Sequence, residues 1–290
     1  MQEAIKKAKV LTEAMDYIQR FRNRIVVVKC GGSMMDDPEA FEDVLRDLVF
    51  MNAVGMRPVV VHGGGKAISG AMDEAKLEVQ FVQGQRYTDQ RTLAIVEHVL
   101  VRQVNDHICK TLQRLGANAM GLHSLSSCVL FAEKMFLETD GRKIDLGQVG
   151  RVTEVNAKLI DLLCRADTIP VIAPVARDAT GAKLNCNGDM AVGEVAAALK
   201  ADKLVVVSDT HGIRRDPDDE NSLMTSADED EIRRLIDSGV ISGGMLPKVQ
   251  SCLRALDAGA KRAHIIDGRY PHALLLEIFT EKGVGTLIHK

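Results

Sequence analysis

The sequence of 290 residues has no tryptophan, few aromatic residues, and no long basic run. A membrane span needs roughly 18 or more consecutive apolar residues, and no segment approaches that length. The net charge of −3 comes from interspersed acids and bases, which disfavours nucleic acid or an anionic membrane as partner. With 46% hydrophobic residues, the chain can bury one large core or two lobes. We therefore expect a globular, cytoplasmic protein that acts on a small molecule.

Closely spaced cysteine or histidine pairs, of the kind that hold zinc, are also absent. The six cysteines lie far apart, several of them in apolar segments, which predicts buried free thiols. The eight histidines are scattered and include no HExxH sequence. We expect no metal ion held by protein side chains.

The sequence does contain β-branched runs that alternate with amphipathic segments. Strands are expected at 25–29, 58–62, 169–173, 204–208 and 263–266. Helices are expected at 37–54, 66–75, 89–115, 154–166, 189–199, 228–238, 246–258 and 271–280, with a hairpin around Asp140 and Gly141. Unbroken β-branched strands separated by helices are typical of a parallel sheet that is covered on both faces.

Two features divide the chain. An additional amphipathic helix at 3–22 precedes the first strand. The turn sequence at 178–181 separates an earlier set of strands and helices from a later one. We predict an N-terminal helix (1–24) followed by two α/β lobes (25–176 and 177–290).

Two strands end in glycines, "RIVVVKCGG" and "PVVVHGGG". They fit no common nucleotide motif, because Ala67 follows Gly65-Lys66 where a P-loop needs Ser or Thr, and Ile68 occupies the last glycine position of GxGxxG. Glycines let backbone N–H groups approach an anion, and a helix that starts just after them directs its positive end to the same place. A tight turn needs only one or two glycines, so an anion cradle is favoured.

Lysines accompany these glycines. Lys29 ends the first strand, and Lys248 in "GGMLPK" follows Pro247, which marks a helix start. A cation in the first turn is disfavoured by the helix dipole unless an anion is bound there. One such lysine is more often a surface residue, but two beside glycine pairs in separate lobes favour a phosphate clamped between the lobes.

The segment "NCNGD" leads into the helix expected at 189–199. Asp189 is placed to cap that helix. Asn185 and Asn187 alternate in an extended segment, so they project to one side and can bind a carboxylate through neutral donors.

Together these motifs resemble the amino acid kinase family, and within it the arginine-inhibited members that phosphorylate N-acetyl-L-glutamate. The resemblance covers almost the whole chain and rests on "KCGG", "VVVHGGG", "GQRYTD", "IDLGQVG", "NCNGDMA", "VVVSDTHGI", "GGMLPK" and "LLEIFTEKGVGTLI", in the family's order and spacing. It implies an open three-layer αβα sandwich with a mainly parallel central sheet, an acceptor-binding first lobe and an ATP-binding second lobe. The implied reaction uses ATP with Mg²⁺ to phosphorylate the side-chain carboxylate in arginine biosynthesis.

The resemblance also implies residue roles. Lys29 and Lys248 would stabilise the transferring phosphoryl group, and Asp189 would orient both. The implied acceptor contacts are Gly64, Gly65, Arg86, Asn185 and Asn187. The implied ATP contacts are Gly31, Gly32, Ser208, Asp209, Gly212, Ile213 and Gly244.

Regulation is implied as well. The N-terminal helix resembles one that links dimers into a hexamer, a trimer of dimers, in arginine-sensitive relatives. Tyr17, His264, Glu277 and Gly283 would form the site for L-arginine. From the residues alone, the helix at 3–22 is equally consistent with packing on its own subunit.

The expected chemistry needs no general base. A carboxylate with a reference pKa of about 4.3 is already ionised at neutral pH, and lysines, glycine N–H groups and Mg²⁺ can stabilise the transferring phosphoryl group. Two alternatives remain. Ser33, Lys66 and Tyr87 differ from the residues expected in the family, which leaves room for another carboxylate acceptor, carrier-linked aminoadipate or aspartate. A non-catalytic arginine sensor would not need the two lysines and Asp189.

Overall fold

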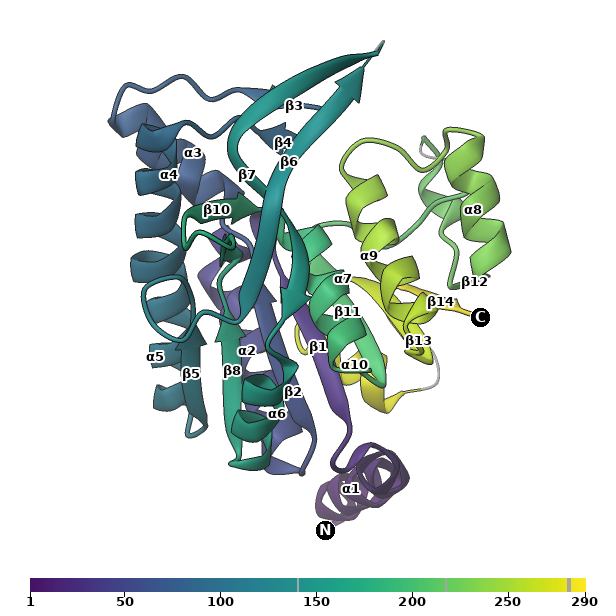
Figure 1. Cartoon of the computed structure of the whole chain (residues 1–290). Coiled ribbons are helices and arrows are strands. Elements are labelled where there is room, and N and C mark those ends of the chain that lie inside the picture. Colours follow the sequence, from purple (N-terminus) through teal and green to yellow (C-terminus); the bar gives the residue numbers. More distant parts are fainter. Residues whose placement is uncertain (140, 217, 281–282) are drawn as a thin grey trace.

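The structure is a computed structural model and describes residues 1–139, 141–216, 218–280 and 283–290. An eight-stranded sheet lies between two layers of helices (Figure 1). In spatial order its strands are β12 (Ser226–Asp228), β14 (Thr286–His289), β13 (Arg262–Asp267), β11 (Lys203–Ser208), β1 (Ile25–Cys30), β2 (Arg57–His62), β8 (Thr168–Ile172) and β5 (Asn118–Leu122). Neighbouring strands are parallel except β13 and β14.

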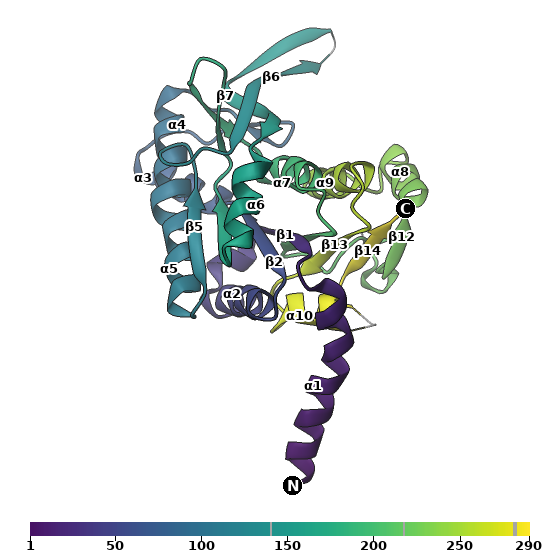
Figure 2. The ribbon, with the colours of Figure 1, turned by 60° about the horizontal axis from the view of Figure 1, so that its bottom comes forward.

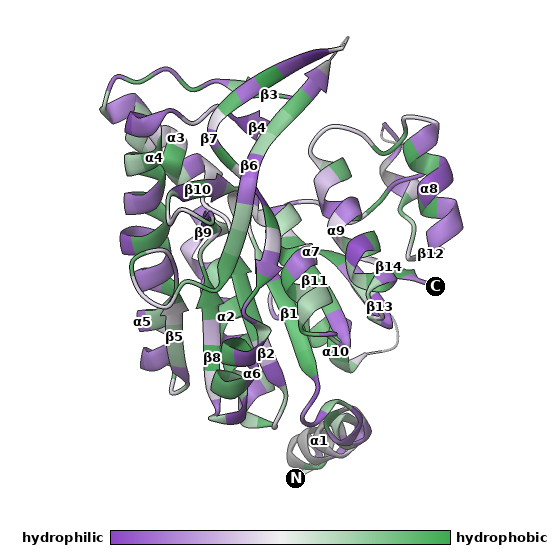
Figure 3. Ribbon diagram, viewed as in Figure 1, coloured by the Kyte–Doolittle hydropathy of each residue, from purple (hydrophilic) through white to green (hydrophobic). Residues whose placement is uncertain are grey.

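The central strands are apolar on both faces, because helices cover both faces. Val27 belongs to the buried cluster on one side of the sheet, whereas Val26 and Val28 belong to the cluster on the other. This alternation follows from the two-residue period of a strand. Figure 3 shows these central strands coloured largely as hydrophobic residues. The predicted α/β class with a mainly parallel central sheet is confirmed.

Helices form the outer layers (Figure 2). One layer contains α2 (Pro38–Ala53), α5 (Asp106–Arg114) and α10 (Ala273–Phe279). The opposite layer contains α6 (Ala157–Arg165), α7 (Gly188–Ala198) and α9 (Met245–Asp257), and α8 (Glu229–Asp237) lies beyond α9. All seven were predicted, although α6 begins three residues later than expected because a strand runs as far as Val155.

The predicted helix at 89–115 is continuous but not uniform. It consists of α4 (Gln90–Glu97), the π-helical segment η2 (His98–Asn105) and α5. No sequence pattern indicated the π segment, which packs with α3 (Gly65–Glu74) in a third apolar cluster. Two short 3₁₀ segments, η1 (Ser33–Asp36) and η3 (Glu220–Ser222), complete the helical elements of the described residues.

A small barrel stands above the sheet and was mostly unpredicted. Its strands are β6 (Leu130–Thr139), β7 (Arg142–Val155), β9 (Val175–Arg177) and β10 (Lys183–Cys186). β6 and β7 form the expected hairpin, in which Thr139 pairs with Arg142, while Asp140 lies outside the described residues. A further hairpin, β3 (Phe81–Val82) and β4 (Gln85–Arg86), lies beside the barrel.

The N-terminal helix α1 (Gln2–Phe21) is confirmed as an element. Its last turns pack on α10, where the ring centroids of Tyr17 and Phe279 are 6.3 Å apart. The rest of α1 extends away from the body of the protein (Figure 2). Across the described residues, no helix is both long and apolar enough to cross a membrane. All six cysteines are free thiols, and four of them are buried.

Candidate active site

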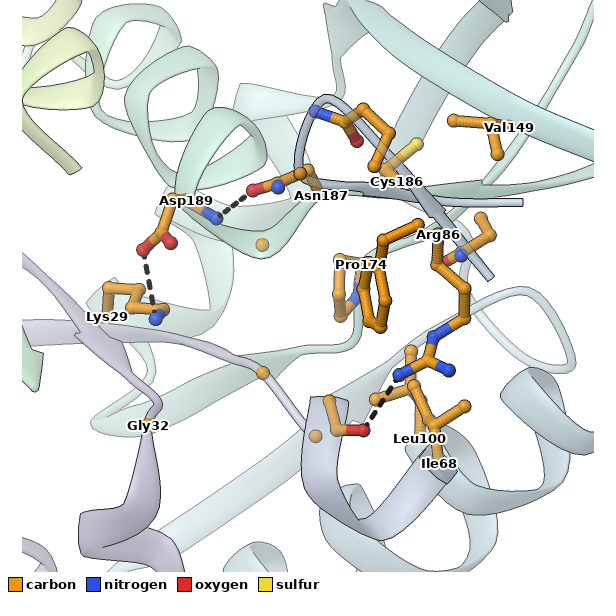
Figure 4. Close-up of a pocket in the computed structure, with 18 of the residues that line it drawn as sticks. Lys29, Gly32, Ile68, Arg86, Leu100, Val149, Pro174, Cys186, Asn187 and Asp189 are labelled. Atoms are coloured by element: carbon orange, nitrogen blue, oxygen red, sulfur yellow. Dashed lines mark hydrogen bonds and ion pairs between the residues drawn. The ribbon is translucent and has the colours of Figure 1, made fainter. Parts of the chain in front are cut away.

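Parallel strands end at a common edge of the sheet, and the glycine-rich segments after β1 and β2 meet there. They lie against the loop between β10 and α7, and together they enclose a cavity of about 240 Å³ (Figure 4). The predicted site residues that line it are Lys29, Gly32, Gly64, Gly65, Arg86, Asn185, Asn187, Asp189 and Lys248. Residues from both ends of the chain therefore share one cavity.

An ion-pair network forms one wall of this cavity. Lys29 Nζ lies 2.9 Å from Asp189 Oδ1, and Lys248 Nζ lies 3.3 Å from Asp189 Oδ2. Burial opposes ionisation of Asp189, but the two cations prevail and hold its pKa below the usual value. One carboxylate therefore holds two ammonium groups, leaving a net positive charge for an anionic ligand.

Gly31 explains why a glycine follows the strand lysine so closely. A Cβ atom at this position would overlap Lys29 Nζ. Any larger residue would push the ammonium group away from Asp189. Figure 4 shows Lys29 and Asp189 facing each other at the edge of the cavity.

The cap of α7 differs from the expectation. Asn187, not Asp189, is the N-cap, and its side-chain oxygen accepts hydrogen bonds from the N–H groups of Asp189 (2.8 Å) and Met190 (3.2 Å). Asp189 lies in the first turn, where the helix dipole stabilises its negative charge. Because Asn187 satisfies the backbone, the Asp189 carboxylate is available to both lysines.

The triple glycine forms the start of α3, with Gly64 as its N-cap. Among the described residues, no protein acceptor receives a hydrogen bond from the N–H groups of Gly64 or Gly65. Both residues line the cavity. Free N–H groups at a helix N-terminus match the predicted anion cradle.

A buried histidine holds this loop in place. His62 Nδ1 lies 2.8 Å from the carbonyl oxygen of Gly63, and Asn105 Nδ2 lies 3.1 Å from His62 Nε2. Because a carbonyl only accepts, Nδ1 carries the proton and Nε2 accepts from Asn105. Complete burial lowers the pKa of His62 to about 4, so the ring is neutral at pH 7.

Arg86 lies on the opposite side of the cavity from Lys29 (Figure 4). Its Nη2 donates to Gly65 O and to Ser69 Oγ, both at 2.9 Å. The guanidinium carbon lies 4.7 Å from the centroid of the Phe81 ring. Burial lowers the pKa of Arg86, but from so high a starting value that the group stays cationic.

A second cavity of about 510 Å³ lies beyond the end of β11 and includes the predicted nucleotide residues Asp209, Gly212 and Ile213. Neither Gly31, Ser208 nor Gly244 is among the described residues that line either cavity. Ser208 is buried at the end of β11, and Gly244 precedes α9, where its carbonyl accepts from Lys248 at 3.3 Å. Their assignment to the nucleotide stays a prediction.

A third cavity of about 590 Å³ is lined by residues from the end of α1, from α10 and from β13. The four predicted effector residues Tyr17, His264, Glu277 and Gly283 all line it. His264 Nδ1 lies 2.5 Å from Glu277 Oε1, and Val284 N–H donates to Glu277 Oε2 at 2.7 Å. Burial raises the pKa of Glu277, but the bond to His264 and the other partners outweigh it and hold the pKa low, so this wall is anionic.

Several residues at these sites were not predicted individually. Thr88 is completely buried between Arg86 and Asn185, and Lys203, also buried, lines the third cavity. Lys66, which the sequence marked only as a departure from the family pattern, forms an exposed ion pair of 2.9 Å with Asp36. Thr88 lies inside the motif "GQRYTD", which was the only sequence signal for its contacts.

A family model described as "Amino acid kinase family" matches residues 24–267, which include both lysines, Arg86 and Asp189. The chain belongs to the amino acid kinase family. Curated members named acetylglutamate kinase resemble it over its full length. The protein from Heliobacterium modesticaldum is 44% identical over 295 residues, covering 100% of both chains. That from Synechocystis sp. is 46% identical over 287 residues, covering 99% of this chain and 95% of the other.

Solved structures of other proteins share the amino acid kinase fold. N-acetylglutamate synthase from Neisseria gonorrhoeae, complexed with coenzyme A and N-acetyl-glutamate, gives a TM-score of 0.84 at 22% identity over 98% of this chain, which spans 63% of that longer protein. Carbamate kinase from Giardia lamblia bound to AMP-PNP gives a TM-score of 0.64 at 15% identity, covering 92% of this chain and 99% of the other. At such identities the likeness concerns the fold alone.

Proposed function

We propose that this protein transfers the γ-phosphoryl group of ATP to the side-chain carboxylate of N-acetyl-L-glutamate, in the cytosol, as a step of arginine biosynthesis. Full-length relatives named acetylglutamate kinase, at 44% and 46% identity, support this acceptor. The observation that carries the proposal is the arrangement of Lys29 and Lys248 on Asp189, in a cavity that also contains Arg86.

The charges of this cavity suit a reaction between two anions. The acceptor carboxylate is ionised at neutral pH and attacks phosphorus without a general base, while the bond between the γ-phosphorus and the ADP oxygen breaks. Lys29 and Lys248 reduce the repulsion between the reactants and stabilise charge on the transferring oxygens. The unpaired N–H groups of Gly64 and Gly65 add hydrogen-bond donors to the same cavity.

The residues that line the two cavities have different binding roles. Arg86 pairs with an acceptor carboxylate, and Asn185 and Asn187 offer neutral donors beside it. We assign the second cavity, with Asp209, Gly212 and Ile213, to the nucleotide. The acceptor lobe would then comprise residues 25–176 and the nucleotide lobe residues 177–290, with residues 1–24 as a separate helix.

Mg²⁺ would bind at this site as a complex with ATP. The facing side chains are mainly cations and amides, so phosphate oxygens and water would hold the ion. When bound, Mg²⁺ neutralises part of the phosphate charge. The lysines remain the protein groups that contact the transferring phosphoryl group.

We also propose inhibition by L-arginine at the third cavity and assembly into a hexamer through α1. An arginine guanidinium would pair with the Glu277 carboxylate, and the unpaired Nε2 of His264 offers a further acceptor. Tyr17 brings α1 into the same cavity. Ligand binding there would thereby couple to the position of α1.

The test is a coupled assay of ADP release with N-acetyl-L-glutamate, L-glutamate and L-aspartate compared side by side. We expect the acetylated compound to be the best acceptor by a wide margin. Equal rates with glutamate, or a preference for aspartate, would overturn the assignment of the acceptor.

A further inference from the structure

The backbone of Thr88 is hydrogen-bonded to β7 through both its N–H group and its carbonyl oxygen. It forms a bridge with Gly147 of β7, in which Thr88 N–H donates to Leu146 O at 3.0 Å and Gln148 N–H donates to Thr88 O at 2.6 Å. Gly147 has a φ of +76°, and a Cβ atom there would overlap the carbonyl oxygen of Thr88. The glycine in "IDLGQVG" therefore lets β7 approach closely enough to hold Thr88.

The side chain of Thr88 joins two predicted acceptor residues. Its hydroxyl donates to the carbonyl oxygen of Arg86 at 2.9 Å and accepts from Asn185 Nδ2 at 3.1 Å. Thr88 is 0% exposed, so water cannot replace either bond. The hydroxyl thus links the end of β4 with β10 at the wall of the cavity.

The direction of these bonds fixes the Asn185 amide. A backbone carbonyl only accepts, so the single hydroxyl proton of Thr88 goes to Arg86 O. The hydroxyl oxygen is then an acceptor, and Asn185 must turn its NH₂ group, not its oxygen, toward Thr88. One N–H of that group remains available to a ligand carboxylate.

We propose that Thr88 is a positioning residue for the acceptor, which holds the Arg86 backbone and sets the amide orientation of Asn185 so that both present donors to a carboxylate. This inference rests on the proposed function of the cavity. Without the hydroxyl, Asn185 is free to turn its oxygen toward the ligand, where it would repel a carboxylate.

The test measures binding to the full-length protein by titration calorimetry, with N-acetyl-L-glutamate and ATP as separate probes. Thr88→Val removes the hydroxyl but keeps the shape, and we expect it to weaken N-acetyl-L-glutamate binding by about 10- to 100-fold while ATP binding is unchanged. Thr88→Ser keeps the hydroxyl and should retain most of the affinity for N-acetyl-L-glutamate. If Thr88→Val does not fold, Thr88→Cys, with a weak donor and acceptor, should give an intermediate affinity.

A double-mutant cycle separates positioning from general packing. If Thr88 acts mainly through Asn185, the variant Thr88→Val/Asn185→Ala should bind little worse than Asn185→Ala alone. The inference would be overturned if the losses in the double variant were additive, or if Thr88→Val lost as much affinity for ATP as for N-acetyl-L-glutamate. It would also be overturned if Thr88→Ser bound as weakly as Thr88→Val, or if Thr88→Cys bound as tightly as wild type.

Arg86→Ala separates a failure of the proposed acceptor site from a failure of the proposal about Thr88. If Arg86→Ala binds N-acetyl-L-glutamate as tightly as wild type, the acceptor site is assigned wrongly. If Arg86→Ala weakens this binding but Thr88→Val does not, only the inference about Thr88 fails.

Discussion

Lys29 and Asp189 form a 2.9 Å ion pair that joins β1 to the first turn of α7. Both side chains are largely buried, and the second oxygen of Asp189 contacts Lys248. A buried carboxylate that holds two lysines fixes their positions and cancels only one of their two positive charges. The arrangement is therefore preorganised for an anion whose charge changes during reaction.

Removing either lysine should slow the chemical step. We expect Lys29→Ala and Lys248→Ala each to lower kcat by on the order of 10²- to 10³-fold, with smaller effects on the KM of the acceptor. Steady-state kinetics will measure the effect, with Lys110→Ala, an exposed lysine of α5, as the matched control. A kcat close to wild type in Lys248→Ala would show that this lysine does not contact the phosphoryl group.

Arg86→Ala should produce the opposite pattern. The loss of a cation that binds a carboxylate should raise the KM of N-acetyl-L-glutamate by about 10- to 100-fold, while kcat at saturating acceptor changes much less. The KM of ATP serves as the internal control, because Arg86 does not line the nucleotide cavity described above. An unchanged acceptor KM would refute the role of Arg86.

His62 should make the fold sensitive to acid. Burial lowers the pKa of His62 from its ordinary value of 6.5 to about 4 in the folded protein, so the unfolded chain binds more protons between these pH values. Stability is then complete above about pH 6.5 and is lost as pH falls toward 4, by on the order of 3 kcal/mol for this group.

Urea denaturation at several pH values will compare wild type with His62→Gln, whose side chain is uncharged. The variant should lose less stability than wild type between pH 7 and pH 4. Parallel pH profiles for the two proteins would mean that His62 is not the group responsible.

Deleting residues 1–20 should dissociate the proposed hexamer and abolish inhibition by arginine while activity remains, because α1 supplies Tyr17 to the third cavity. Light scattering and inhibition assays will measure both properties. Glu277→Gln is the companion variant: it should lose inhibition yet keep the hexamer. A full-length dimer that is unaffected by millimolar arginine would refute the regulatory assignment.

Local sequence patterns were enough to locate the cleft. The β-branched runs that end in Lys29 and His62 predicted buried parallel strands, and the glycines after them predicted an anion site beside α3. These signals are reliable because strand burial and helix starts depend on neighbouring residues. The same reasoning identified Lys248 from its position beside Pro247 in the first turn of α9.

The barrel and the hydrogen bonds within it could not be predicted in this way. β9 and β10 have three and four residues, too few for a clear period-two pattern. The local pattern placed Asp189 at the cap of α7, whereas Asn187 is the cap. Both are good capping residues, so the pattern could not choose between them, and only the family resemblance implied that Asp189 holds the two lysines. The contacts of Thr88 depend on a bridge to distant Gly147, which no local pattern encodes.

The central claim is the formation of an acyl phosphate on N-acetyl-L-glutamate, and trapping with hydroxylamine tests it most directly. Purified protein with ATP, Mg²⁺ and N-acetyl-L-glutamate should yield the corresponding hydroxamate, and Lys29→Ala/Lys248→Ala should yield almost none. L-Glutamate should give far less product than its acetylated form. Release of ADP without any hydroxamate, or equal hydroxamate from L-glutamate, would contradict the account.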